Sequence, residues 1–453
     1  MRPESDSQVP KGLISQPLLV KRPRGNGVKG HAGPKDFTIP QEHEFLYQPH
    51  QPTEPTKDDV PIPTPLDSSK FACAAVELTA PALAQNTFAV GGVLLDSTGK
   101  VWQAMHNHVI ENNCINDPTA HGERQLLSWY LQQRTQGVPI PDPDQMTIVT
   151  SLDPCVMCTG AFLATGVNVA IISLDDMAGV NYKADDKLLV IPEAMRPEAL
   201  AQFSYLGLQG NPVRAFAGSP RSVFVNQSIP QSDDAASLAN FTQSAKIVYR
   251  ILDELDPAPV NVLSPGGASG LKIVKHFYPQ AAVLNVDLTS GPSCLALRAA
   301  MTLVAQLRHS PSGRRNAAAL IDPFGNVLMI AGYEAPALGG TELDTPFMVL
   351  TRNYATCRKL TLGVDGALPH PKRCNWVLLK GAGDTLETDL MDLGAYGSTM
   401  EGALPEDVET NFFYFDPQQT AESLAKMTKA LPPLYSDVIK VNPIQLRTVM
   451  SHI

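Results

Sequence analysis

Apolar residues recur along this chain with two periods, one typical of helices and one typical of strands. A spacing of three to four residues predicts helices at 67–86, 121–133, 237–255 and 293–307. Short apolar runs between turn residues predict strands at 88–95, 101–104, 147–152, 167–174 and 375–380. In the first helix we expect Ser68 or Ser69 to be the cap and Pro81 to end or kink the helix. Helices alternate with strands, which predicts an α/β fold.

The turn between the first two strands has a counterpart in the second half of the chain. Asp96-Ser97-Thr98-Gly99 separates those strands, and Asp322-Pro323-Phe324-Gly325 follows at a constant offset. A predicted helix precedes each hairpin, and residues 375–380 correspond to the strand at 147–152. We interpret residues 291–453 as a degenerate copy of the first half. The alternative is an unrelated α/β domain with a chance hairpin match.

The residues most typical of chemistry lie in the first half. His121-Gly122-Glu123 is followed by Pro154-Cys155-Val156-Met157-Cys158. His121, Cys155 and Cys158 offer one imidazole and two thiolates, which suits a catalytic zinc that keeps a fourth position open for water. An apolar run follows the cysteines, so we expect both at a helix N-terminus, where the helix dipole and free N–H groups favour the thiolate.

Glu123 is the expected acid–base residue of this site. Zinc lowers the pKa of bound water to about 7, and a neighbouring carboxylate can move the proton to a ring nitrogen and then to a leaving amine. A structural zinc site is the alternative, and it needs a fourth Cys or His at short spacing. Cys114 is the nearest candidate, and the chain has no second C-x-x-C. The sequence therefore favours catalytic zinc.

These motifs carry a resemblance to a known family. Residues 88–182 resemble the cytidine-deaminase-like superfamily, in its nucleobase and tRNA-adenosine deaminase branch, with its H-x-E and P-C-x-x-C signature. The segment 116–121 is similar to guanine deaminases, and 154–158 to tRNA adenosine deaminases. His-Gly-Glu and Met-Cys-Thr-Gly-Ala are similar to fungal cytosine deaminase. The resemblance implies a three-layer α/β/α sandwich, present twice in this chain, and hydrolytic deamination that releases ammonia.

The resemblance also implies substrate contacts. Asn107, at a predicted strand end, corresponds to an Asn that contacts the base in the family, and an ordinary turn residue is the alternative. Ala120 and Pro154, beside the metal ligands, are further candidates. We expect a purine: adenine or adenosine, within tRNA or free, or guanine. A cytosine or cytidine deaminase and a non-catalytic scaffold with a zinc fold are the alternatives.

The charge and the composition of the remaining sequence predict how the chain is divided into domains. The 453 residues carry a formal charge of −10, which argues against a protein that coats nucleic acid. Residues 1–66 are rich in proline and include Lys21-Arg22-Pro23-Arg24; we expect a disordered tail, with an arm for RNA or a nuclear-import patch as alternatives. The expected domains are the tail, a catalytic domain at 67–220, a connector at 221–290 and the second copy at 291–453.

Composition and layout also set expectations about location and assembly. Seven cysteines of odd number and uneven spacing indicate a reducing compartment, and no apolar run is long enough to span a bilayer. We therefore expect a cytoplasmic protein, with the nucleus as the alternative. The two copies should pack as an intramolecular pseudo-dimer, similar in layout to the eukaryotic tRNA adenosine deaminase heterodimer, and further oligomerisation stays open.

Overall fold

The computed structural model contains two five-stranded sheets. It describes residues 66–181, 188–210, 221, 223–224, 227–252, 257–289, 291–362, 367–381, 384, 386–399, 405–408, 411–415, 421–436, 439 and 441–444. The predicted tail lies outside the described residues except for Leu66. In the described part of the chain, every helix is too short or too polar to span a bilayer.

The first half is built on a five-stranded sheet in the order β2-β1-β5-β6-β7. Strand β1 pairs antiparallel with β2 and β5, and β6 and β7 continue the sheet in parallel. The bounds are β1 (Gly91–Asp96), β2 (Val101–His106), β5 (Met146–Leu152), β6 (Asn168–Ser173) and β7 (Phe203–Tyr205).

The second half has a sheet with the same order and the same strand directions. Its order is β11-β10-β12-β13-β14; β10 pairs antiparallel with β11 and β12, and the last two strands add in parallel. The bounds are β10 (Ala317–Ile321), β11 (Val327–Ala331), β12 (Asn375–Leu379), β13 (Phe412–Phe415) and β14 (Val441–Ile444).

The two hairpins also agree in detail. Each carries a register shift at the corresponding place, Leu94/Leu95 in one and Leu320/Ile321 in the other. Each turn glycine has a positive φ, 85° at Gly99 and 86° at Gly325, a conformation that costs glycine little because it has no Cβ. The shared turn chemistry is what made the repeat visible in the sequence.

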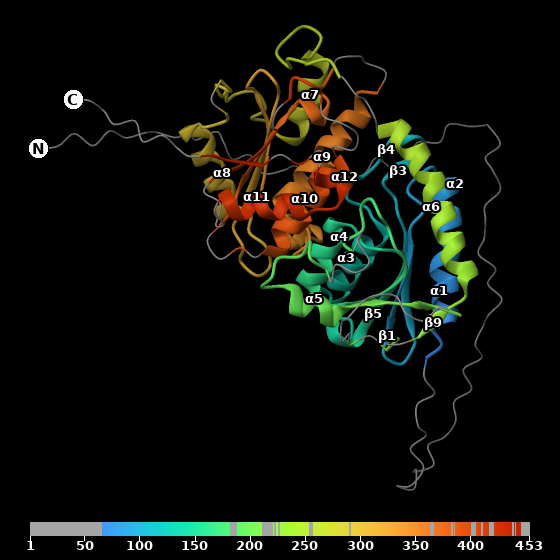
Figure 1. Ribbon diagram of the computed structural model, residues 1–453. Helices are drawn as coiled ribbons and strands as arrows, with labels where there is room; N and C mark the ends of the chain where they lie inside the picture. The colour runs from blue at the N-terminus through green and yellow to red at the C-terminus, as the bar shows by residue number, and fades with distance from the viewer. Residues whose placement is uncertain are drawn as a thin grey trace, which may run out of the picture. The chain divides into compact units, whose positions relative to one another are not determined.

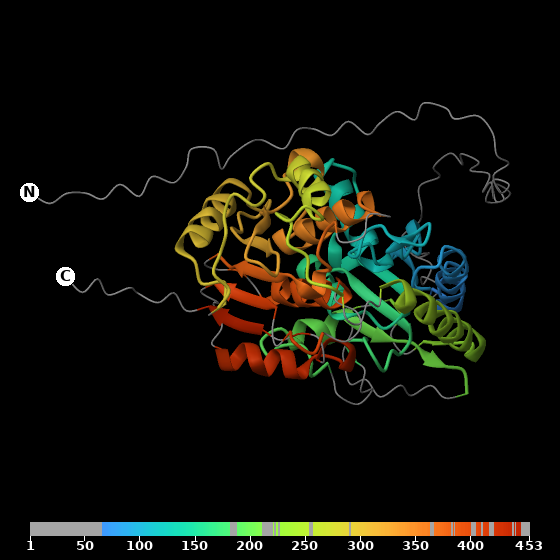
Figure 2. The ribbon, with the colours of Figure 1, turned by 90° about the horizontal axis from the view of Figure 1, so that it is seen from above.

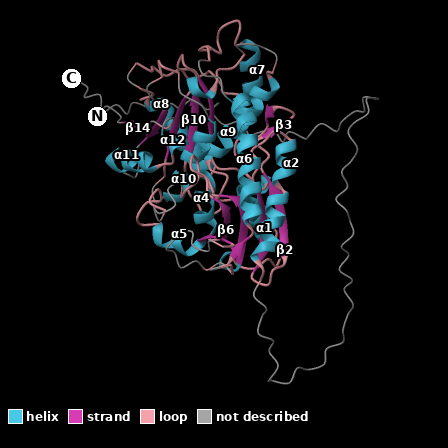
Figure 3. Ribbon diagram, turned by 45° about the vertical axis from the view of Figure 1, so that its right-hand side comes forward, coloured by secondary structure: helices cyan, strands magenta, loops and turns pink. Residues whose placement is uncertain are grey.

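Helices cover both faces of each sheet, so each half has three layers. In the first half α1, α2 and α6 lie on the outer face (Figure 3), and α3 and α4 lie on the inner face. In the second half α8 lies outside, and α9 and α10 lie inside. Seen from above, the inner helices stand between the two sheets (Figure 2). The bounds are α1 (Ser68–Glu77), α2 (Thr79–Ala84), α3 (Gly122–Thr135), α4 (Val156–Thr165), α6 (Gln231–Leu252), α8 (Leu295–Leu307), α9 (Pro346–Leu360) and α10 (Leu386–Thr399).

Smaller elements complete the described structure. Helix α6 contacts the first half and α7 contacts the second, so the predicted connector reaches both. The remaining bounds are α5 (Arg196–Gln202), α7 (Ala268–Phe277), α11 (Ala421–Ala430), α12 (Pro433–Ser436), β3 (Ile110–Glu111), β4 (Cys114–Ile115), β8 (Gly207–Leu208) and β9 (Ser228–Ile229), with short 3₁₀ turns at Pro143–Gln145, Pro336–Leu338 and Pro371–Arg373.

The structure corrects two predicted helices. The first is two helices, and its cap is Asp67, whose carboxylate accepts a hydrogen bond from the Ser69 N–H at 3.0 Å. The break falls between Glu77 and Thr79, and Pro81 lies in the first turn of α2, where a missing N–H costs little, so the predicted interruption by Pro81 agrees with the structure. Helix α6 begins at Gln231, well before the predicted start. The prediction missed its first turns because they are polar and show no apolar period.

The two halves meet where α4 packs against α10 (Figure 1). A Cβ at Gly160 of α4 would lie 2.6 Å from the Glu387 carbonyl oxygen, and a Cβ at Gly394 of α10 would lie 2.1 Å from the Met157 backbone nitrogen. Only glycine permits helix backbones to approach so closely. Met157 and Met391 belong to one buried apolar cluster that spans both halves.

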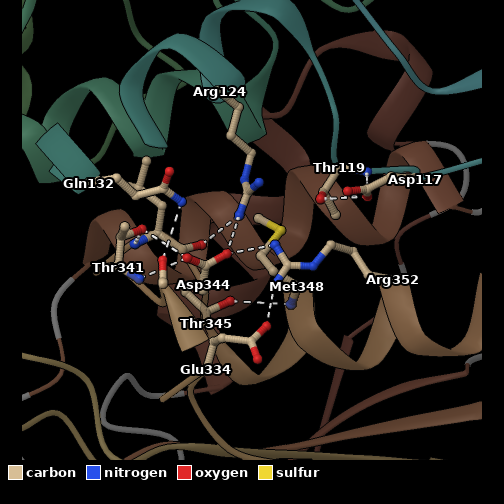
Figure 4. A network of polar contacts seen from close by, with 12 residues as sticks. Asp117, Thr119, Arg124, Gln132, Glu334, Thr341, Asp344, Thr345, Met348 and Arg352 are labelled. Atoms are coloured by element: carbon tan, nitrogen blue, oxygen red, sulfur yellow. Dashed lines mark hydrogen bonds and ion pairs between the residues drawn. The ribbon is translucent and has the colours of Figure 1, made fainter. Parts of the chain in front are cut away.

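A buried ionic network also joins the halves (Figure 4). Arg124 of α3 donates to the Leu343 carbonyl at 2.9 Å and pairs with Asp344 at 3.4 Å. Arg352 of α9 pairs with Asp344 at 2.6 Å and with Glu334 at 3.1 Å. Burial works against ionisation of Asp344, but Arg352 and Arg124 outweigh it and lower its pKa to about 2.

Gly394→Ala tests the helix contact. The added methyl would collide with the Met157 backbone, so we expect roughly 3 kcal/mol of lost unfolding free energy in denaturant titrations, although alanine is the better helix former. Zinc content should fall too, because Met157 lies between the two cysteines. Gly266→Ala is the matched control, since the nearest atom to its Cβ would be 3.9 Å away. Wild-type stability in Gly394→Ala would contradict the contact.

Asp344→Asn tests the ionic network. A folded-state pKa lowered from 3.8 to about 2 stabilises the fold above pH 4, by about 2 kcal/mol, and the contribution disappears as the pH falls towards 2. The unfolding free energies of wild type and variant should therefore differ at pH 7 and converge below pH 4. Asp142→Asn, in the exposed pair with Arg134, should change little at either pH. A wild-type advantage that persists at low pH would argue against the assignment.

Candidate metal centre and active site

Two helix N-termini bring the predicted metal ligands together. His121 is the residue that precedes α3, Cys155 precedes α4, and Cys158 lies in the first turn of α4. Their ligand atoms all lie within 4.8 Å of one another. Among the described residues, this is the one such group of three or more His, Cys, Asp or Glu side chains. The three residues are therefore placed so that they can hold a metal ion.

The chemistry of this donor set fits zinc. Cys155 Sγ lies 3.5 Å from His121 Nδ1, and Cys158 is fully buried. The hydrogen bond from Cys158 and the nearby His121 hold the pKa of the Cys155 thiol well below its usual range, whereas burial and the Cys155 charge raise the pKa of Cys158. One thiolate is therefore favoured by the protein, and a thiophilic cation would stabilise the second. Three protein ligands leave a position for water.

Glu123 lies beside the ligands and outside the ligand group. Its Oε1 accepts a hydrogen bond from the Thr150 hydroxyl at 3.1 Å, and its Oε2 lies 3.7 Å from Cys158 Sγ. Burial and the negative charge of Cys155 raise the pKa of this carboxyl group. A carboxylate that gains a proton easily, held next to a metal site, is suited to general acid–base work.

Asn107 follows β2 and is buried in the same site. Its Oδ1 accepts a hydrogen bond from the Gly122 N–H at 2.5 Å, at the start of α3. The side-chain oxygen therefore already serves the start of α3, and the NH₂ group of Asn107 can donate to a ligand.

Ala120 and Pro154 are buried next to the ligands but do not line the recess described below. The Ala120 carbonyl accepts from the His108 N–H at 2.8 Å, and the Pro154 carbonyl accepts from the Val180 N–H at 2.8 Å. Both backbones shape the loops that carry His121 and Cys155. A direct substrate contact by either residue stays a prediction.

A recess that is partly open to solvent connects these groups. Sequence reasoning missed several of its walls, which come from elements far along the chain. Phe241 and Tyr249 belong to α6, and Leu434 and Tyr435 belong to α12. No motif marked them, because an aromatic or Leu in an amphipathic helix has the same pattern whether it faces a core or a site. The full lining is Phe88, Val90, Asn107, His121, Glu123, Leu152, Asp153, Cys155, Asp175, Ala178, Phe241, Tyr249, Leu434 and Tyr435.

In the second half, a lysine follows the strand that corresponds to β5. By the strand registers, Lys380 after β12 corresponds to Leu152 at the end of β5. Its Nζ lies 3.2 Å from Asp384, 3.1 Å from Asp389 and 2.7 Å from Asp392, all buried. Burial opposes the charge, but the three carboxylates outweigh it and raise the pKa of Lys380 well above its usual value. The Lys380 ammonium is therefore the positive charge among these three carboxylates.

A comparison with known families identifies the first half. Residues 66–174 match the family described as the cytidine and deoxycytidylate deaminase zinc-binding region. This part of the chain is similar to that family. The zinc-binding character of that family agrees with the ligand set of His121, Cys155 and Cys158.

Solved structures that are similar to this chain include two kinds of deaminase. One comes from a study of A-to-I editing by tRNA:A34 deaminases, with 22% identity, a TM-score of 0.22, and coverage of 25% of this chain and 82% of that one. Another is guanine deaminase from Nitrosomonas europaea, with 18% identity, a TM-score of 0.26, and coverage of 40% of this chain and 88% of that one. No curated protein sequence matches the chain.

Metal analysis tests the site. We expect one zinc per chain, because three ligands meet in the first half and no second such group is present among the described residues. Cys158→Ser should lower the zinc content towards zero, whereas Cys357→Ser, at a buried thiol in α9 of the second half, should leave it unchanged. Elemental analysis that found two zinc ions per purified chain would contradict this account of the second half.

Proposed function

We propose that this protein is a zinc-dependent hydrolase that deaminates a nucleobase, preferentially a purine, and releases ammonia. The observation that carries the proposal is the meeting of Glu123 with His121, Cys155 and Cys158 in one recess that Asn107 also lines. A structural metal site would have no use for a buried carboxylate 3.7 Å from a ligand sulfur and outside the ligand group.

The residues divide the reaction among them. Zinc, when bound, supplies a Lewis acid that makes water nucleophilic near neutral pH. Glu123 accepts the proton of the attacking water, passes it to a ring nitrogen and delivers a proton to the leaving amine. Thr150 holds one carboxyl oxygen at 3.1 Å, so the other stays directed towards the ligands and the base. The products are a carbonyl at the attacked carbon and ammonia.

Asn107 supports the choice of a purine. Its NH₂ group can donate to an acceptor such as a purine ring nitrogen or carbonyl oxygen. The Asn116–Thr119 segment, which also suggested a purine, does not line the recess, and Asp117 instead accepts hydrogen bonds from the N–H and hydroxyl of Thr119 at 2.8 and 2.7 Å. The purine preference therefore rests on Asn107 and on the resemblance, with cytosine as the alternative.

We further propose that residues 291–453 are a zinc-free copy that serves as the partner of the catalytic half. The identical strand order and the shared hairpin geometry support this. A covalently linked partner is always present at high effective concentration. The second half can then support α4 through α10 and contribute walls to the site.

Ammonia release with Glu123→Ala as reference tests the function. The variant should keep its zinc, because Glu123 is not in the ligand group, and lose turnover by about 10³-fold, the scale of general acid–base catalysis. Wild type and variant should be compared on adenine, guanine, cytosine and their nucleosides, nucleotides and tRNA. Near-normal turnover by the variant would refute the proton-transfer role. Turnover of cytosine or cytidine alone would replace the purine with the pyrimidine.

A further inference from the structure

We infer that the site takes a free, uncharged purine base, and that helices α6 and α12 exclude bases that carry phosphate. This inference rests on the proposed function and specifies its substrate class. Three observations support it: the anchoring of α6, the anchoring of α12, and the charges that line the recess between them.

Helix α6 is fixed against the sheet by serine side chains. The Ser237 hydroxyl donates to the Ser151 carbonyl at 2.6 Å, and the Ala89 N–H donates to Ser244 Oγ at 2.8 Å. Phe241 then stacks on Phe88 with ring centroids 6.1 Å apart, and Tyr249 meets Phe88 edge to face at 5.8 Å. These three rings form an aromatic wall whose members hold one another in place. Flat bases pack well on such surfaces.

Helix α12 supplies a wall from the second half and is held from both sides. The Leu434 N–H donates to the Met177 carbonyl of the first half at 3.0 Å. The ring of Tyr435 occupies the space beside Gly397 of α10, where a Cβ would lie 2.0 Å from Tyr435 Cδ1. Tyr435 is 1% exposed. The wall therefore belongs to the packed structure, and a ribose or phosphate group directed towards it would have to displace it.

The charge of the lining also argues against phosphate. Glu123, Asp153 and Asp175 line the recess, and none of its described lining residues is a Lys or Arg. Asp153 is held by the Tyr205 hydroxyl at 2.7 Å, and Asp175 by the Met177 N–H at 2.9 Å. Whether ionised or neutral, these carboxyl groups offer a phosphate no positive charge. A bound zinc ion would not offer one either, because the Cys155 and Cys158 thiolates balance its charge. Enzymes that act on nucleic acid need a cationic surface for its backbone.

Ammonia release by the full-length wild type tests the inference directly. Guanine and adenine should be compared with their nucleosides, 5′-monophosphates and tRNA. We expect kcat/KM for the free base to exceed that for the monophosphate and tRNA by about 100-fold or more, the size of effect expected from an uncompensated charge. A monophosphate or tRNA turned over within tenfold of the base would overturn the inference.

Binding separates failure of this inference from failure of the proposed function. Titration of zinc-loaded Glu123→Ala with guanine and with guanosine 5′-monophosphate does not need turnover. Tighter binding of the base, with no ammonia from any wild-type reaction, would refute the function and support the site's selectivity. Equal binding of both ligands, or binding of neither, would overturn the selectivity.

Variants test whether α6 and α12 set the limit. Tyr249→Ala and Leu434→Ala should raise the nucleoside-to-base ratio of kcat/KM by about tenfold, since pocket contacts of this size discriminate by roughly 10–200-fold. Phe324→Ala and Leu360→Ala, at exposed residues 49% and 60% accessible, are the matched controls and should leave the ratio unchanged. Zinc content and unfolding midpoint report whether each variant folds. Phe241→Leu is a milder change to the same aromatic wall than a replacement by alanine. Folded wall variants with the wild-type ratio would overturn the role of these helices.

Discussion

The close contact between α4 and α10 is the constraint on which the site depends. Helix α4 carries Cys158 in its first turn and follows Cys155, so its position sets two of the three metal ligands. It is held by a helix of the other half across two glycines, Gly160 and Gly394, with no room for a methyl group. The geometry of the metal centre is therefore a property of both halves, even though every ligand comes from the first.

The two halves use one framework for two different charges. In each, a strand end and two helix N-termini converge on one place. In the first half His121 and the two cysteines form a metal site there, and in the second the Lys380 ammonium is surrounded by three carboxylates.

Several features of the fold and the site followed from local sequence. The turn Asp96–Gly99 and its repeat predicted two hairpins, because Asp accepts hydrogen bonds from turn amides and glycine tolerates positive φ. The spacing of His121, Cys155 and Cys158 predicted a zinc site, since both cysteines sit on consecutive parts of one helix start. The three-layer α/β fold predicted from these elements is confirmed. The polar start of α6 and the Asp67 cap were missed, because neither has an apolar period.

What the sequence determined by itself was chemistry of short range: the ligand set, the acid–base residue beside it, and the hairpins. The tertiary structure alone decided which distant segments close the site. Tyr249 and Leu434 lie far from the motif along the chain, and their place in the recess follows from the packing of α6 on the first sheet and of α12 between α10 and Met177. Packing of this kind depends on surfaces that form only after folding, so no local sequence pattern predicts it.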